Sequence, residues 1–191
     1  MSLPPPAART LAHTRQVVFQ GYARDDGLWD IEARMTDTKT HPLYADRGEV
    51  QPGQPIHDIL VRVTVDDAFV IREIAATLDS APFGECQAAG HPVQKLVGAT
   101  LGPGWRKRIE EAMGGVGGCT HLRELLFNVA TAAYQTIPSY RDHQRKLRGE
   151  PRPAGDEPPY HVGKCMSWDT HGTVVQRLLP QFIGWQPKPK R

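Results

Sequence analysis

The chain is organised around one stretch, Gly114-Gly115-Val116-Gly117-Gly118-Cys119-Thr120-His121-Leu122-Arg123-Glu124-Leu125-Leu126, in which four glycines lead directly into a helical pattern. Apolar residues recur at helical spacing from Leu122 to Ala133, which predicts a helix with one face packed on a core. We expect this long helix to begin at Cys119. It should end near Ile137, because Pro138 disfavours helical backbone in the residue before it.

Two hairpin patterns precede this helix. Residues 17–24 and 28–35 alternate in polarity around Asp25-Asp26-Gly27, and the Asp-Gly pair favours the positive φ values of a tight turn. Residues 59–65 and 69–77 repeat the pattern around Asp66-Asp67. Four strands of one antiparallel sheet are therefore predicted. Strands first and helices afterwards indicate an α+β fold.

The remaining segments predict further elements and the domain limits. Residues 92–96 and 105–113 are expected helices, and 160–168 with 172–179 are expected to form a last strand and a short helix. Residues 37–55 show no period and predict a loop that is either functional or mobile. We expect a proline-rich arm over 1–12, one α+β domain over 13–180, and a basic tail over 181–191.

Composition narrows the class of protein. The 191 residues are 39% hydrophobic, enough for one sizeable core. Lys+Arg 23 against Asp+Glu 21 gives a net charge of +2, which argues against a nucleic-acid partner. No apolar run approaches the roughly 20 residues of a membrane helix, and no secretory signal is visible. Three cysteines, an odd number with no close pair, suit a reducing compartment. We expect a soluble cytoplasmic protein.

The strongest candidate site is Cys119 with His121, and with Glu124 one turn beyond His121. A helix start presents free N–H groups and a positive dipole end, which favour a thiolate and bound anions. A thiolate nucleophile and a thiolate metal ligand both need this arrangement. The alternative is a buried cysteine in a tight glycine-rich turn, with His121 capping polar groups.

Other candidate residues lie elsewhere in the sequence. His57-Asp58, at a strand start, offers an imidazole and a carboxylate, although adjacent strand residues point to opposite faces. Tyr22 is a further proton-transfer candidate. We expect four residues to bind the substrate. Trp29 and Trp105 would form pocket walls, with Lys39 from a loop and Arg24 from a turn.

A metal centre is the alternative use of the cysteines and histidines. If the loop after the sheet folds over the start of the long helix, Cys86, His91, Cys119 and His121 form a Cys₂His₂ set suited to zinc. Cys165 is then left over or replaces a histidine. The spacing is not that of a known zinc finger. We therefore favour an accidental scatter of cysteines and histidines over a metal site.

Several motifs occur together in one order: Gly-Tyr-Ala-Arg-Asp-Asp-Gly-Leu-Trp-Asp at 21–30, Asp-Thr-Lys at 37–39, Ile-His-Asp at 56–58, Gly-Pro-Gly-Trp at 102–105 and Gly-Cys-Thr-His-Leu at 118–122. In these motifs the chain resembles, over about residues 13–180, a proteobacterial family catalogued as a domain of unknown function. The resemblance implies a protein like those found in proteobacteria that degrade aromatic compounds. It carries over no catalytic residue.

These observations lead to an expected function. We expect an enzyme without a cofactor, of lyase or hydrolase type, that acts on a small aromatic or phenolic compound by acid–base chemistry. An aldehyde-releasing retro-aldol cleavage is one concrete form, since a base and a group that stabilises a phenolate suffice. The alternative is a Cys/His module that binds zinc or iron or holds a protein partner. A homodimer is expected, because the proline-rich arm and the segment after Pro138 offer surface to cover.

Overall fold

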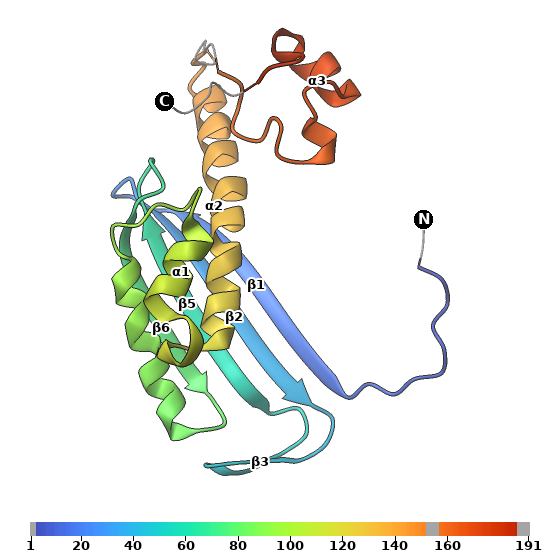
Figure 1. Cartoon of the computed structure of the whole chain (residues 1–191), viewed down its shortest axis with the longest axis vertical. Coiled ribbons are helices and arrows are strands. Elements are labelled where there is room, and N and C mark those ends of the chain that lie inside the picture. The colour runs from blue at the N-terminus through green and yellow to red at the C-terminus, as the bar shows by residue number, and fades with distance from the viewer. Residues whose placement is uncertain (1–2, 152–156, 187–191) are drawn as a thin grey trace. The chain divides into compact units, whose positions relative to one another are not determined.

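The computed structural model describes residues 3–151 and 157–186, and its contacts divide the chain into two compact units, residues 1–144 and 145–191, where the sequence predicted one domain over 13–180. The first unit contains a four-stranded antiparallel sheet in the order β1-β2-β5-β6 (Figure 1). Its strands are β1 (His13–Ala23), β2 (Trp29–Lys39), β5 (Pro55–Val65) and β6 (Ile71–Ser80). The predicted sheet of two hairpins and the α+β class are confirmed.

The two faces of this sheet differ as the alternation requires. On the helix-covered face, β2 buries Ile31, Ala33 and Met35, which pack in the same core as the apolar residues of β5 and α2. On the other face, ion pairs cross between strands: Arg62 contacts Glu32 at 2.6 Å, and Arg34 contacts Asp58 at 2.7 Å. β1 is an edge strand, since it pairs with β2 alone.

Helices cover the apolar face of the sheet (Figure 1). They are the 3₁₀ segments η1 (Gly84–Leu96) and η2 (Gly115–Gly117) and the α-helices α1 (Trp105–Met113) and α2 (Thr120–Leu147). The predicted apolar stripe of α2 is confirmed, because it buries Leu122, Leu125, Leu126, Val129, Ala133 and Ile137. α2 approaches β1 so closely that a Cβ on Gly21 would overlap the Thr136 side chain.

The predicted end of the long helix was wrong. α2 continues through Pro138 for another nine residues, to Leu147. A proline in a helix interior costs about 3 kcal/mol. Packing of the residues before and after Pro138 offsets this cost, so the helix continues. Ile137 is fully buried, and Tyr140 packs edge-on against Trp29 at a ring separation of 5.8 Å. The Ser139 hydroxyl also donates to the Gln135 carbonyl at 2.6 Å.

The segment 37–55 is not a simple loop. β2 extends through Asp37 to Lys39, and a small hairpin follows, formed by β3 (Leu43–Ala45) and β4 (Gly48–Val50). Val50 at its end is buried. The sequence pattern missed this hairpin because each of its strands has only three residues, too few to show a period.

The second unit is small. It contains η3 (Met166–Trp168), α3 (Thr173–Leu178) and η4 (Pro180–Phe182), with a core of Val162, Val175, Leu179 and Phe182. The predicted helix over 172–179 is confirmed. The predicted strand over 160–168 is wrong, because turns and η3 occupy that segment. The basic residues at 188–191 lie outside the described residues.

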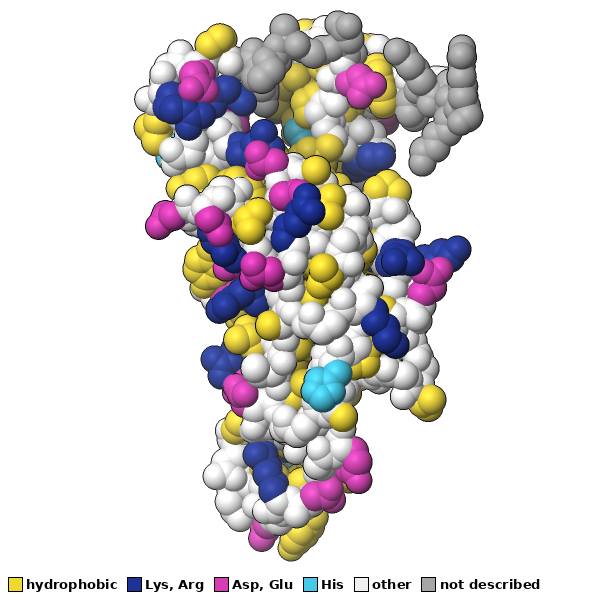
Figure 2. All heavy atoms as spheres, turned by 90° about the vertical axis from the view of Figure 1, so that its left-hand side faces the viewer, with side chains coloured by type: hydrophobic (Ala, Val, Ile, Leu, Met, Phe, Trp, Pro, Cys, Tyr) yellow, Lys and Arg dark blue, Asp and Glu magenta, His cyan; other side chains and the backbone are white. Residues whose placement is uncertain are grey.

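The surface agrees with the even charge balance. Basic and acidic side chains are interspersed on the face shown in Figure 2, where neither sign forms a broad patch. Among the described residues, no helix combines the length and apolar character that crossing a membrane requires.

Candidate functional site

A buried carboxylate, Asp37, lies where three strands meet side by side. In the sheet register, Asp37 of β2 is opposite Arg15 of β1 and opposite His57 of β5. Residues directly opposite in antiparallel strands share a face, with Cβ atoms roughly 5 Å apart. The register alone therefore places a guanidinium and an imidazole on either side of one carboxylate, on the face that α2 covers.

Asp37 accepts four hydrogen bonds from three side chains. Its Oδ1 accepts from His13 Nε2 at 2.8 Å and Arg15 Nε at 2.9 Å. Its Oδ2 accepts from Arg15 Nη2 at 2.8 Å and His57 Nδ1 at 3.0 Å. Only 3% of the residue is exposed. These donors satisfy the full accepting capacity of a carboxylate.

The donors decide the charge of Asp37. Burial by itself would raise the pKa of the Asp37 carboxyl, but hydrogen bonds from Arg15 and His13 and the charge of Arg15 outweigh burial, and the pKa lies well below its usual range. The same contact raises the pKa of Arg15. Asp37 is thus a fixed negative charge at neutral pH.

That charge fixes the tautomer of His57. An ionised carboxylate can only accept, so the neutral His57 ring must carry its proton on Nδ1, which lies 3.0 Å from Asp37 Oδ2. Nε2 of His57 is then left with a lone pair. This is the arrangement in which a carboxylate orients an imidazole that takes up protons.

A second imidazole comes from α2. His121 lies in the first turn of α2, because the Cys119 carbonyl accepts the first helical bond, from Arg123 N at 3.1 Å. Its ring centre is 4.2 Å from that of His57, and its Nδ1 is 3.9 Å from Cys119 Sγ. Burial, together with His57 and Arg15, lowers the pKa of His121. The neutral form of His121 is therefore favoured relative to a free imidazole.

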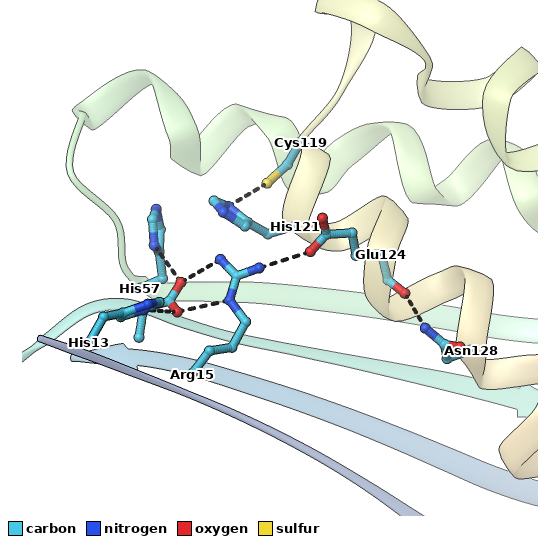
Figure 3. Close-up of polar contacts among 8 residues, drawn as sticks. His13, Arg15, His57, Cys119, His121, Glu124 and Asn128 are labelled. Atoms are coloured by element: carbon cyan, nitrogen blue, oxygen red, sulfur yellow. Dashed lines mark hydrogen bonds and ion pairs between the residues drawn. The ribbon is translucent and has the colours of Figure 1, made fainter. Parts of the chain in front are cut away.

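Arg15 connects the sheet to α2. Its Nη1 donates to Glu124 Oε2 at 3.0 Å while its other two nitrogens hold Asp37 (Figure 3). The Glu124 carboxylate is half exposed, with 52% of its side chain accessible. Asn128 Nδ2 donates to the Glu124 carbonyl one turn later, at 3.0 Å. Glu124 thus positions Arg15 and offsets its charge.

The arrangement also resembles a set of metal ligands. Asp37, His57 and His121 each offer one ligand atom, and these atoms lie within 4.8 Å of one another. Of the Cys₂His₂ set expected from the sequence, only His121 belongs to this group. Cys86 and His91 lie in η1, and the three cysteines are free thiols.

Three predicted site residues lie away from this cluster. Asp58 is on the opposite face of the sheet, where both its oxygens accept from Arg34, at 2.8 and 2.7 Å. Tyr22 is opposite Asp30 on that same outer face and is exposed. Arg24 contacts Asp26 at 2.5 Å and Asp30 at 3.4 Å.

The other predicted binding residues also lie outside the cluster around Asp37. The two tryptophans are buried: Trp29 Nε1 donates to Asp67 Oδ1 at 3.0 Å, and Trp105 Nε1 donates to the Leu126 carbonyl at 2.8 Å. Lys39 ends β2, in register with His13.

Sequence reasoning missed Asp37, His13 and Arg15 as members of the site. One signal was available for Asp37. It continues the odd-numbered series of β2, so the alternation that buries Ala33 and Met35 puts Asp37 on the same face. A carboxylate on a buried face requires partners, and these are supplied by the opposed strands.

The comparisons with known proteins give one result. No curated protein and no solved structure shows a significant match to the chain. One family model, described as "Protein of unknown function (DUF2889)", matches residues 13–135. That range is well over half of the 191 residues and contains His13, Arg15, Asp37, His57 and His121. The chain therefore belongs to the DUF2889 family.

Proposed function

We propose that the protein is an enzyme that carries out acid–base chemistry on a small aromatic or phenolic compound, with His57 as general base. The observation that carries the proposal is the buried Asp37 carboxylate, which holds Nδ1 of His57 at 3.0 Å and leaves Nε2 to accept a proton. The proton-transfer chemistry rests on this geometry. The substrate class rests on the resemblance to proteins of bacteria that degrade aromatic compounds.

Asp37 stabilises the protonated form of His57. When Nε2 takes a proton, the contact from Nδ1 to Asp37 becomes a hydrogen bond between two charged groups, which is roughly twice as strong as a neutral one. Asp37 keeps its charge throughout, because its pKa lies far below neutrality. It is a positioning residue and need not touch the substrate.

His121 gives the site a second proton carrier. The ring is close to His57, at 4.2 Å between centres, and burial lowers its pKa. Two imidazolium ions this close would repel each other, so the pair holds one added proton at a time. Cys119, at 3.9 Å from His121 Nδ1, helps to set the orientation of this ring.

A lyase reaction needs only these groups. His57 removes the proton of a hydroxyl group on the second carbon from an aromatic ring. The bond between the hydroxyl-bearing carbon and the carbon beside the ring breaks, and the hydroxyl-bearing carbon leaves as an aldehyde. The bonding electron pair delocalises from the carbon beside the ring into a carbonyl group of the substrate that is conjugated with that carbon, which gives an enolate. The protonated imidazole then gives its proton to that carbon, so the enzyme returns to its starting state. The same base can activate water in a hydrolase.

The test uses single substitutions at the two histidines. Wild type, His57→Gln, His121→Gln and the control His41→Ala are compared for turnover of pooled lignin-type aromatics, with released aldehyde as the second readout. His41 is an exposed histidine in the same unit. Loss of a general base lowers kcat by about 100-fold or more. Unchanged turnover in the His57 variant would refute the role of this residue.

A further inference from the structure

We infer that Asp37, His57 and His121 form a binding site for one divalent transition-metal ion of the zinc class. This inference uses the residues of the proposed function but does not rest on it. The ligand atoms of the three side chains are within 4.8 Å of one another and come from three different elements, β2, β5 and α2.

One of the three ligand separations matches that between ligands of one ion, and the other two are at most 4.8 Å. Zinc binds imidazole nitrogen and carboxylate oxygen at about 2.0–2.2 Å, so two ligands of the same ion are separated by roughly 3 to 3.5 Å. His57 Nδ1 and Asp37 Oδ2 are already 3.0 Å apart. An ion bound by both atoms displaces the proton that they share, and that proton moves to Nε2 of the same ring. The ion lies to one side of the line that joins the two atoms, so the His57 ring and the Asp37 carboxylate must turn towards it. The protein charge is unchanged by this transfer.

The donor set indicates the kind of ion. Two imidazoles and one carboxylate suit zinc, iron(II) and cobalt(II), whereas calcium and magnesium prefer oxygen ligands alone. Three protein ligands leave at least one position for water or a substrate oxygen, as in zinc sites that bind exchangeable ligands.

The surrounding residues support such a site. His13 and Arg15 hold Asp37 Oδ1 at 2.8 and 2.9 Å, so the carboxylate is oriented before an ion arrives. The positive charge of Arg15 opposes a cation, but Glu124 at 3.0 Å and Asp37 itself offset it. His13, Arg15 and His57 all hydrogen-bond to Asp37, and the His121 ring lies against that of His57 at 4.2 Å between centres. Figure 3 shows the rings of His57 and His121 side by side.

Metal binding and general-base catalysis compete for His57. With the ion on Nδ1 and the proton on Nε2, the ring has no lone pair to accept a proton from a substrate. An ion of this class should therefore inhibit the proposed proton transfer. This relation gives the experiment two independent readouts, binding and turnover.

The experiment uses the full chain after treatment with a chelator. Zinc binding is measured by calorimetry, and cobalt(II) binding by its visible absorption. Wild type should bind one ion per chain. His57→Ala and His121→Ala should each weaken binding by at least 100-fold, and His13→Ala should weaken it by about 10- to 100-fold, because it removes a partner of a ligand. The controls His41→Ala and His91→Ala, which remove histidines outside the group, should bind as wild type does. Circular dichroism checks that each variant is folded, and His57→Gln or His121→Gln replaces any variant that is not.

The outcomes separate this inference from the proposed function. No ion bound by wild type, or binding unchanged in the two ligand variants, would overturn the metal site and leave the general base standing. Binding with inhibition of turnover supports both. Binding that is required for turnover supports the metal site and overturns proton transfer by a metal-free His57.

Discussion

Replacing Asp37 by Asn tests the centre of the site, because the change keeps the shape of the side chain and removes its charge. Asp37 is buried and accepts four hydrogen bonds from nitrogen atoms of His13, Arg15 and His57. An amide nitrogen in place of either oxygen would face donors instead of acceptors. If it replaces Oδ2, it points at Arg15 Nη2, which can only donate, so that contact becomes repulsive. The contact with His57 Nδ1 survives only if the ring moves its proton to Nε2.

The expected loss of stability follows from these contacts. Removing one partner of a buried ion pair costs about 3–5 kcal/mol. The donors are not fully buried, since Arg15 and His13 keep 35% and 36% of their side-chain surface in water and can rehydrate. We therefore expect Asp37→Asn to lower the free energy of unfolding by about 2–4 kcal/mol at pH 7.

The matched control is Asp58→Asn. Asp58 also accepts two bonds from one arginine across the sheet, at 2.8 and 2.7 Å, but Arg34 has 58% of its side chain exposed. Pairs of this kind contribute about 1 kcal/mol or less. Urea unfolding followed by tryptophan fluorescence gives both free energies. A loss below 1 kcal/mol for Asp37→Asn, or equal losses for the two variants, would refute the argument.

The pH dependence gives a further check on the same variant. The pKa of Asp37 in the folded protein lies below its ordinary value of 3.8, so the carboxylate stabilises the fold fully above that value. This contribution is lost as the pH falls towards the folded-state pKa. The difference between wild type and Asp37→Asn should therefore be constant above about pH 5 and shrink below about pH 4. A constant difference down to pH 2 would contradict the assignment.

Three other predictions address the helix, the close approach and the sheet edge. The pKa of His121 is lowered below 6.5, so unfolded chains bind more protons and stability should fall as the pH drops below that value; an NMR midpoint for His121 at or above 6.5 would contradict this. Gly21→Ala should cost about 1–3 kcal/mol in urea unfolding because its Cβ would overlap Thr136, whereas Gly84→Ala, with no atom within 4 Å, should cost less than 1 kcal/mol. The free edge of β1 has no charged residue from Gln16 to Ala23, so two copies of the chain should pair along it. Sedimentation should then show twice the 21.2 kDa mass, and Val18→Lys should restore the monomer. A wild-type monomer at micromolar concentration would contradict the pairing.

Much of the fold was predictable because its strands and main helix are long enough to show their periods. The alternation over residues 28–35 buries Ile31 and Ala33 as expected, and the stripe of α2 needed no tertiary information. The end of α2 was not predictable from local rules. The effect of Pro138 on the backbone is local, but the packing of Tyr140 on Trp29 that offsets it involves residues far apart in sequence.

The candidate site was predictable only in part. His57 and His121 were identified as candidates one by one, from a strand start and a helix start. Their proximity depends on how α2 lies on the sheet, and no spacing in the sequence reports it. The role of Asp37 depends on register, since Arg15 and His57 become its partners only when β1 and β5 pair with β2 as they do.

The site depends on an edge strand of the sheet. β1 has a neighbour on one side only, yet its first three residues supply His13 and Arg15, three of the four hydrogen bonds to Asp37. Proteins open locally at such edges well before the whole domain unfolds. Each such opening would leave Asp37 and His57 in place on the inner strands but without His13 and Arg15, whose hydrogen bonds keep the carboxylate charged and fixed. Warming should therefore inactivate the protein at a temperature where its core is still intact.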